Sequence, residues 1–311
     1  MRLLVSFDRY QENWYVGELY YNFLLYLQDL GIDVVYKNIK DLEKEYKKEN
    51  NDNLSIFSIY NLIITNKDTN KTFIHSLSDY APAMMDDNTG ILNFDVSAFS
   101  CSSNLNDEVV SRYTKYKIIP SFYILENFTD LELVDKFYAS KKTINACYFN
   151  GLCYGHRSRY KDILSDKNIF HFKDKNNPEE YRDKVGYFGD LSNYKYGISL
   201  DGAAKICYRD IEYFGLGILC LRERLNIITH NPIIEEFHYL NIFDDDIQKL
   251  LYDESNSGTV LDYVKNKINN ITEEERLYVT SNAREWYINN CTKSSQIKLL
   301  HKFLIDANIL N

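Results

Sequence analysis

Residues Tyr196 to Arg222, YGISLDGAAKICYRDIEYFGLGILCLR, contain the pattern that decides the fold. Tyr196–Leu200 is a short apolar run that ends at Asp201-Gly202, which predicts a buried strand followed by a turn. Small residues then lead into a predicted helix over Ile206–Phe214, and Ile218–Leu221 is the next apolar run. Strand, helix and strand in this order form a βαβ unit, which builds parallel sheets covered by helices.

The same alternation extends from this unit toward the N-terminus. Ile144–Phe149 and Ile169–Phe172 predict strands, with a basic helix between them that begins near His156. Leu3–Phe7 and Ile32–Tyr36 are predicted strands on either side of a helix whose apolar residues recur at helical spacing. Further strands are predicted at Leu62–Thr65, Thr72–Leu77, Ile91–Val96 and Ile118–Ile124, and further helices at Lys40–Lys48, Glu108–Tyr116 and from Asn177 onward.

Two such alternating series in a chain of 311 residues indicate two domains. A polar, acidic helix within Glu126–Lys142 separates the two series, so we expect one Rossmann-like domain at residues 1–135 and a second at residues 136–311. The second domain is expected to end in helices that begin at the capping box Thr272–Glu275. Ligands of such sheets bind at the carboxyl ends of the strands. The expected fold class is therefore α/β, with two Rossmann-like domains facing across a cleft and a helical C-terminal tail.

Composition bounds the partners and the compartment. The balance of 45% hydrophobic and 26% charged residues is that of a soluble globular chain, and the net charge of −9 argues against a nucleic-acid partner, although a local basic pocket is compatible with it. Leu3–Phe7 meets Asp8 too soon for a signal-peptide core, and no segment approaches the ~20 apolar residues of a membrane span. The six cysteines show no zinc-site spacing, so we expect reduced thiols in a cytoplasmic protein.

The turn and helix after Asp201-Gly202 carry the first candidate site. A helix that begins near Lys205 would present free backbone N–H groups and its positive end to a ligand. Lys205 and Arg209 share one face of that helix, and Glu212 follows Arg209 by three residues. Arginine suits a diphosphate and a carboxylate suits ribose hydroxyls, so a nucleotide fits this pattern. An exposed Arg–Glu pair on an ordinary helix is the alternative interpretation.

The second candidate site is the stretch Tyr148–Arg159, YFNGLCYGHRSR. A predicted strand ends near Gly151, and His156 and Arg157 stand at the start of the following helix. Cations at a helix N-terminus oppose the helix dipole, so an anionic ligand would explain them better than helix stability does. A solvated basic face is the alternative. Asp244-Asp245-Asp246 is formally an acidic triplet, but the acidic first turn of a helix explains it more simply than a metal site.

With these residues in place, the chain resembles the donor-binding half of GT-B glycosyltransferases, in particular the protein O-glucosyltransferase/capsule xylosyltransferase and exostosin families. These families share a strand, a D/R-G element and then an R-x-x-E-x-x-x-x-G run. The D/R-G element is similar to Asp201-Gly202 here, and the run is similar to Arg209-Asp210-Ile211-Glu212 followed by Gly217. The resemblance covers roughly residues 143–300 and includes Phe149-Asn150-Gly151 with His156-Arg157, Phe237–Leu240 and Asn282–Tyr287. Cys207 departs from it, because a Ser or Thr usually stands there in the glucosyltransferases, and this leaves the donor sugar and nucleotide open.

The resemblance implies that Arg209 and Arg157 contact the donor diphosphate, that Glu212 contacts the ribose or the sugar, and that the residues Asp201 and Gly202 line the sugar pocket. It also implies a metal-independent enzyme without a cofactor. An inverting transfer needs a base to deprotonate the acceptor hydroxyl, for which Asp79 is the first candidate and Asp8 and Asp95 are competitors. A retaining mechanism would not need this base.

The sequence therefore predicts a hexosyl- or pentosyltransferase that moves a sugar from a nucleoside-diphosphate sugar to a glycan acceptor. Two alternatives stay open. A nucleotide-sugar epimerase would share the two-domain layout and convert the donor without an acceptor. A non-catalytic two-domain protein would bind a ligand without turnover. Acceptor, linkage, stereochemistry and oligomeric state do not follow from these residues.

Overall fold

The chain divides into two compact units. A computed structural model describes residues 1–8, 16–49, 61–76, 96–101, 117–120, 131–150, 160–173, 184–201, 205–250 and 256–310. Unit 1 comprises Met1–Thr129, Asn226–Pro232 and Lys293–Asn311, and unit 2 comprises Asp130–Leu225 and Ile233–Thr292. The first boundary lies near the expected one, but the C-terminal segment from Lys293 belongs to unit 1 rather than to the second domain.

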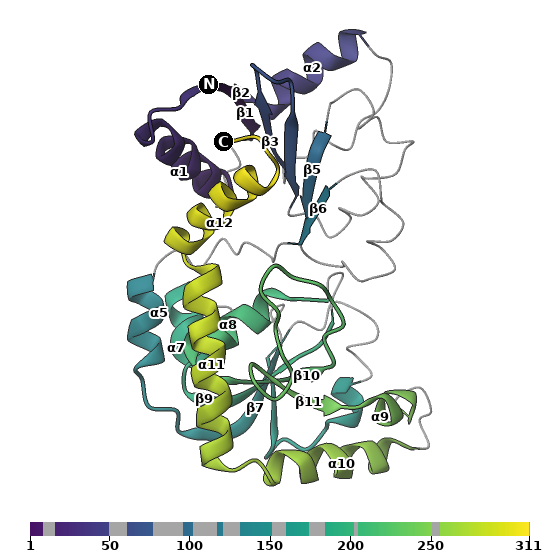
Figure 1. Cartoon of the computed structure of the whole chain (residues 1–311). Helices are drawn as coiled ribbons and strands as arrows, with labels where there is room; N and C mark the ends of the chain where they lie inside the picture. The colour runs from purple at the N-terminus through teal and green to yellow at the C-terminus, as the bar shows by residue number, and fades with distance from the viewer. Residues whose placement is uncertain are drawn as a thin grey trace. The chain divides into compact units, whose positions relative to one another are not determined.

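Unit 1 contains a mixed six-stranded sheet in the order β2-β1-β3-β4-β5-β6 (Figure 1). Strand β3 runs antiparallel to both β1 and β4, while β1–β2, β4–β5 and β5–β6 are parallel. Its elements are β1 (Arg2–Phe7), α1 (Val16–Asp29), β2 (Asp33–Asn38), α2 (Ile39–Glu49), β3 (Asn61–Asn66), β4 (Thr72–Ser76), β5 (Val96–Cys101), β6 (Lys117–Pro120) and α12 (Lys293–Asp306).

The β3–β4 connection explains why this sheet is not wholly parallel. Asn66 Oδ1 accepts hydrogen bonds from the backbone N–H groups of Asp68 and Thr69, at 2.9 and 3.2 Å, and closes a tight turn. Asn70 in that turn has a positive φ of 59°. A connection this short can join only antiparallel strands, because a parallel crossover needs a dozen or more residues.

Helix α12 joins unit 1 because its apolar face is part of that unit's core. Leu300, Phe303 and Leu304 are buried in one cluster with residues of β1, β3, β4 and α1. The Asn66 side chain donates to the backbone carbonyl of Ile309 at 2.9 Å, which ties the segment after α12 to the β3–β4 turn. The amphipathic pattern therefore predicts the helix, and its packing partner decides the unit to which it belongs.

Unit 2 contains a five-stranded sheet in the order β11-β10-β9-β7-β8, and every neighbouring pair is parallel. This is a doubly wound order, in which the chain changes direction across the sheet between β7 and β9. Its elements are α5 (Leu131–Tyr138), β7 (Ile144–Asn150), β8 (Phe170–Lys173), α7 (Lys184–Leu191), β9 (Tyr194–Ser199), α8 (Tyr208–Leu216), β10 (Leu219–Glu223), β11 (Leu240–Phe243), α9 (Asp245–Leu250), α10 (Ser257–Asn269) and α11 (Glu273–Cys291).

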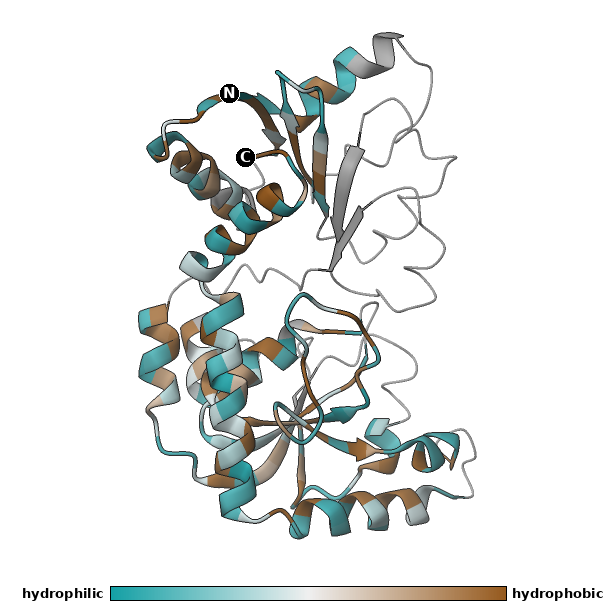
Figure 2. Ribbon diagram, viewed as in Figure 1, coloured by the Kyte–Doolittle hydropathy of each residue, from teal (hydrophilic) through white to brown (hydrophobic). Residues whose placement is uncertain are grey.

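The core of unit 2 forms between this sheet and its helices. Ile198, Leu219 and Leu221 are fully buried in a cluster that also contains Val260 and Val264 of α10. Figure 2 shows α10 banded in hydrophobic and hydrophilic colours, as expected of a helix that buries one face. The parallel sheet and helices confirm the α/β class expected for this half of the chain.

Local sequence signals hold where the structure describes them. Thr272 caps α11 by accepting a hydrogen bond from the Glu275 N–H at 3.1 Å, as the capping box predicts. Asp244 accepts from the Ile247 N–H at 3.1 Å, and Asp246 pairs with Lys249, so the acidic triplet forms the first turn of α9. The predicted helix at residues 108–116 and the predicted helix start at residues 177–180 lie outside the described residues, whereas α7 is described from Lys184.

Most of the described cysteine side chains are buried in the core of unit 2. Cys147, Cys207, Cys220 and Cys291 are free thiols, and burial raises the pKa of Cys147 and Cys291. In the part of the chain that the structure describes, no helix has the length and apolar character needed to cross a membrane.

Candidate functional site

Helix α8 has clear signals at both ends. The Asp210 carboxylate, in the first turn, accepts a hydrogen bond from the backbone N–H of Cys207 at 2.7 Å. Gly217 ends the helix in the left-handed conformation, at φ 67°, which a glycine adopts without strain. The helix follows β9 and precedes β10, so its N-terminus lies at the carboxyl end of β9.

Tyr213 anchors α8 over the point where the strand order reverses. A Cβ atom on Gly197 of β9 would lie 2.3 Å from Cζ of the Tyr213 ring, so the absence of a side chain lets the ring pack directly on the strand. The Tyr213 hydroxyl is 3.2 Å from the carbonyl oxygen of Ile198 in β9 and 3.4 Å from that of Tyr148 in β7. In doubly wound sheets ligands bind outside the carboxyl ends of these two strands.

Arg209 lies one helical turn closer to that edge than Tyr213. Its Nε and Nη1 are buried, and neither has a hydrogen-bond partner among the described residues. Burial alone would lower the pKa of this guanidinium, but Tyr213, Tyr187 and Glu212 outweigh that effect and raise it. Arg209 is thus a half-buried cation with two buried, unused donor nitrogens, which is unfavourable in the free protein and suits an anionic ligand. The exposed Arg–Glu pair considered as the alternative is not observed.

Glu212 lies on the same side of α8 and is held by Tyr187. The Tyr187 hydroxyl donates to Glu212 Oε2 at 2.6 Å. Burial, with the charge of Glu212 second, raises the pKa of Tyr187 well above its ordinary value, so it stays a donor at neutral pH. Tyr187 could not be predicted from the sequence, because α7 is separated from α8 in the chain and nothing local marks the contact.

Arg222 connects the elements that surround the start of α8. Its Nη1 donates to Asp210 at 2.6 Å, and its Nη2 donates to Asp201 at 3.0 Å and to the Lys205 carbonyl at 2.8 Å. The guanidinium is buried, with the Tyr239 ring 5.7 Å away, so it acts within the fold. In the sequence, Arg222 is marked only by being a lone charge at the end of an apolar strand, which does not identify its partners.

Asp201 and Lys205 therefore lie in this network beside the site. Asp201 accepts from Arg222 and also pairs with Lys205, whose side chain is half exposed. These contacts use both carboxylate oxygens of Asp201 within the protein. Its expected role in lining a sugar pocket stays a prediction.

Several predicted site residues lie outside the described residues: Gly151, His156, Arg157, Gly202, Asp79 and Asp95. The strands that precede the two glycine bends, β7 and β9, are adjacent and parallel, with Phe149 opposite Ile198. The carboxyl ends of β7 and β9 therefore lie at the same edge of the sheet. Asp8, a competitor for the catalytic base, accepts from the Asn38 side chain at 3.4 Å.

The other segments that carry the resemblance stabilise unit 2. His238 Nδ1 accepts from the Ile234 N–H at 2.8 Å, and burial lowers the pKa of His238 to about 4. Arg284 donates to the carbonyl oxygen of Gly215, at the C-terminal end of α8, at 2.6 Å and also pairs with Asp135. A cation at this end of a helix is favourable.

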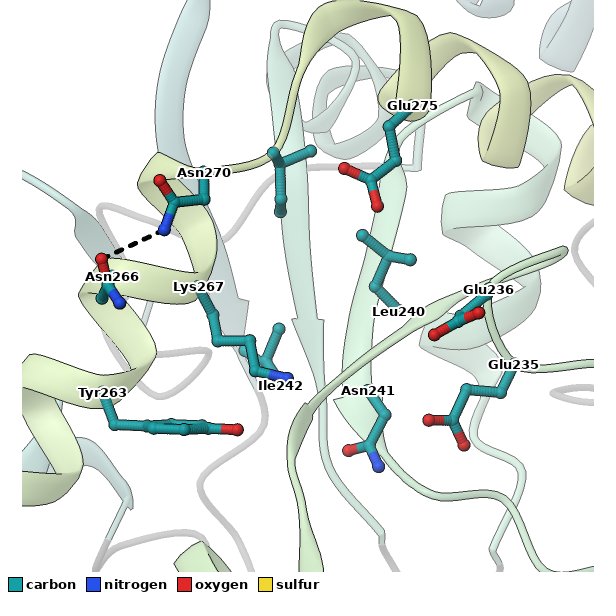
Figure 3. A pocket seen from close by; sticks show the side chains of 11 residues that line it. Glu235, Glu236, Leu240, Asn241, Ile242, Tyr263, Asn266, Lys267, Asn270 and Glu275 are labelled. Carbon is teal, nitrogen blue, oxygen red and sulfur yellow. Dashed lines mark hydrogen bonds between the residues drawn. The ribbon is translucent and has the colours of Figure 1, made fainter.

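A polar cavity of about 430 Å³ lies apart from Arg209, between the edge strand β11 and α10 (Figure 3). Glu235, Glu236 and Glu275 contribute carboxylates to its wall, and Lys267 lies beside the Tyr263 ring, 5.4 Å from its centroid. Glu235 is paired with Arg224, which leaves more negative than positive charge in the wall. This cavity is therefore unsuited to a diphosphate.

The side chains near Arg209 provide donors for an anion and an acceptor for hydroxyl groups. Among the described residues, no group of three or more His, Cys, Asp or Glu side chains could hold a metal ion. The arrangement fits binding of a phosphate-containing ligand through Arg209 and the N-terminus of α8.

Comparisons with known proteins give structural likeness only. No family model matches the chain, and no curated protein matches its sequence. An alpha-glucosyltransferase in complex with UDP and a 13-mer DNA containing an HMU base is similar, with 9% sequence identity and a TM-score of 0.45 over 98% of this chain and 99% of that one. The same enzyme type with UDP-glucose and DNA containing an abasic site gives 10% identity and a TM-score of 0.48, with coverage of 98% and 99%.

A glycosyltransferase from Rickettsia africae ESF-5 is also similar, with 10% identity and a TM-score of 0.41 over 98% of this chain and 97% of that one. These similar structures are glycosyltransferases.

The expectation that nucleic acid is not a partner is contradicted, because alpha-glucosyltransferases in complex with DNA are among these similar structures. The net charge of −9 does not by itself exclude a nucleic-acid partner, because it sums over the whole chain. A protein with a negative total can still present a local basic surface to a phosphate backbone.

Proposed function

We propose that this chain is a glycosyltransferase that binds a nucleoside-diphosphate sugar in unit 2 and transfers the sugar to an acceptor hydroxyl without a metal ion. The observation that carries the proposal is the pair of buried, unpartnered donors on Arg209 at the N-terminus of α8. A guanidinium with two buried, unused nitrogens beside the β7–β9 switch point is arranged for an anion that the free protein lacks.

The same groups suit the chemistry of transfer. Negative charge develops on the departing nucleoside diphosphate when its bond to the sugar breaks. Donors that are already oriented stabilise that charge without reorganisation, which is the principle of an oxyanion hole. Arg209 and the α8 N-terminus would take this part, and Glu212, held by Tyr187, would accept hydrogen bonds from hydroxyl groups of the ribose or the sugar.

The remaining parts of the proposal come from the sequence. Asp79 would deprotonate the acceptor in an inverting reaction. Arg157 would be a second diphosphate contact, and Gly151, His156, Lys205, Asp201 and Gly202 would complete the donor site. A GT-B arrangement, the resemblance to the protein O-glucosyltransferase and exostosin families, a hexosyl or pentosyl donor and a cytoplasmic location also belong to the proposal.

The first test is a thermal-shift and saturation-transfer NMR screen against UDP-, GDP- and dTDP-sugars, with and without a chelator. We expect one of them to bind and Arg209→Ala to abolish binding without changing the circular dichroism spectrum. Asp79→Asn should then abolish transfer and spare donor binding. Donor affinity that is intact in the Arg209 variant, or lost on chelation, would contradict the proposal.

The acceptor needs its own experiment. A glycan acceptor is our proposal, and DNA containing a hydroxymethylated base is assayed beside it because similar structures contain DNA. Transfer of label from the identified donor to either acceptor supports a glycosyltransferase. Conversion of the donor to another sugar without any acceptor would instead show an epimerase, and specific binding of a ligand that contains no nucleotide, without turnover, would show a binding protein.

A further inference from the structure

A second buried polar group at the carboxyl end of β9 also lacks a partner. Ser199 is fully buried, and its hydroxyl oxygen makes no hydrogen bond to the described part of the chain. A serine hydroxyl can both donate and accept, so it normally finds a partner inside a protein. Arg209 has free N–H donors that the Ser199 oxygen could accept, yet no hydrogen bond joins these two residues.

The geometry of the sheet and helix places Ser199 opposite Arg209. Gly197 and Ser199 are two residues apart in β9, so they lie on the same face of the sheet, and Gly197 faces the Tyr213 ring of α8. Two residues along a strand advance about 6.6 Å, and four residues along a helix advance about 6 Å. Helix α8 runs antiparallel to the strands. The advance from Gly197 to Ser199 along β9 therefore matches the advance from Tyr213 to Arg209 along α8 in both length and direction.

The register of the neighbouring strand agrees with this placement. Ser199 lies directly opposite Arg222 of β10, and the Arg222 side chain reaches Asp210, the residue next to Arg209 in α8. Ser199 therefore lies on the face of the sheet that meets the first turn of α8. It is also the last residue of β9, the strand that forms one side of the switch point.

We propose that the Ser199 hydroxyl donates a hydrogen bond to the same phosphate group that Arg209 binds, so that the anion bridges the two residues. The inference rests on the proposed function and adds a residue to it. A phosphate suits this place because its oxygens can accept from the strand on one side and from the helix on the other. The free protein leaves both groups unpaired, and the ligand gives each of them a partner.

The test compares Ser199→Ala with Arg209→Ala and with the matched variant Ser6→Ala. Ser6 is also fully buried on a strand with an unpartnered hydroxyl, but it lies in unit 1. UDP affinity is measured by isothermal titration calorimetry, pyrophosphate binding by the broadening of its ³¹P NMR signal, and the melting temperature by calorimetry without ligand.

We expect Ser199→Ala to weaken the binding of UDP and of pyrophosphate about tenfold or more, since a hydrogen bond to a charged group is lost. The melting temperature of the free Ser199→Ala protein should stay the same or rise, because no hydrogen bond in the free protein is removed. Ser6→Ala should leave both affinities unchanged.

Three results would overturn the inference while leaving the proposed function in place, provided that Arg209→Ala abolishes binding. The first is wild-type UDP affinity in Ser199→Ala. The second is a loss of UDP affinity with pyrophosphate binding intact, which would place Ser199 at the nucleoside. The third is a lower melting temperature of free Ser199→Ala, which would reveal a structural hydrogen bond. If Arg209→Ala binds UDP normally, the proposed function itself fails.

Discussion

Replacing Arg209 with methionine should stabilise the free protein and abolish its binding of a nucleoside diphosphate. Methionine keeps the length of the side-chain stem and removes the guanidinium with its two buried, unpartnered nitrogens. A binding group that is unsatisfied without its ligand lowers the stability of the free protein. The same substitution at Arg222, whose guanidinium donates hydrogen bonds to other groups of the protein, should instead lower the stability of the free protein.

The magnitude follows from the contacts around the two arginines. Each buried donor without a partner costs about 1–3 kcal/mol, while the lost attraction to the partly exposed Glu212 carboxylate costs about 1 kcal/mol or less. We therefore expect the free energy of unfolding to rise by at least about 1 kcal/mol in Arg209→Met. Arg222→Met is the matched comparison: it leaves the buried Asp210 without its cation and should lower the free energy of unfolding by about 3–5 kcal/mol.

Urea denaturation followed by tryptophan fluorescence measures this change in unit 2 alone. The chain has two tryptophans, and Trp286 packs edge-on against Phe214 of α8 at 5.9 Å. A Trp14→Phe background leaves Trp286 as the reporter. In the same samples, UDP at about 100 times its dissociation constant should stabilise the parent protein by about 2.7 kcal/mol and Arg209→Met by nothing measurable.

A decrease of more than about 1 kcal/mol in the free energy of unfolding of Arg209→Met, at an unchanged denaturant slope, would contradict this prediction. That result would mean that the guanidinium already has partners that stabilise the fold. Retained stabilisation by UDP in this variant would be equally damaging, because the unused donors would then have no role in binding.

Three further predictions concern other parts of unit 2. Gly197→Ala places a Cβ 2.3 Å from the Tyr213 ring, so overpacking should lower the free energy of unfolding by about 1–3 kcal/mol and weaken UDP binding, as measured by denaturation and calorimetry. Tyr187→Phe removes the 2.6 Å hydrogen bond to Glu212 and should lower stability by about 1–3 kcal/mol and UDP affinity severalfold in the same assays. Burial lowers the pKa of His238 from 6.5 to about 4, so the neutral side chain contributes its full stability above pH 6.5 and loses that contribution as the pH falls to about 4. Denaturation at several pH values should show the free energy of unfolding falling by up to about 3 kcal/mol over this range. In His238→Asn this part of the pH dependence should disappear.

Each of these predictions has a control or a contrary outcome. Gly258→Ala in α10 meets no atom within 4 Å and should raise stability by about 0.5–1 kcal/mol, the opposite sign to Gly197→Ala. Unchanged UDP affinity in Tyr187→Phe would remove Glu212 from the binding site. An unaltered pH dependence in His238→Asn would assign the acid sensitivity to other groups.

Several elements of unit 2 and the place of Arg209 in its helix can be predicted from the sequence. Short apolar runs, the helical stretch between them and the Thr272–Glu275 capping box are local signals, and they correctly predict β9, α8, β10 and the start of α11. Arg209 could be found because helix N-termini and basic residues at that spacing have a physical meaning that depends only on nearby residues.

Contacts between elements that are distant in the chain follow from the tertiary packing and not from local sequence. The antiparallel β3, the assignment of α12 to unit 1 and the partners of Arg222 depend on which surfaces pack together. Ser199 and Tyr187 are ordinary residues of a strand and a helix until strand register and helix packing bring them to the first turns of α8. The physical reason is that periodicity specifies which face of an element is buried, whereas register and packing specify the residue it meets.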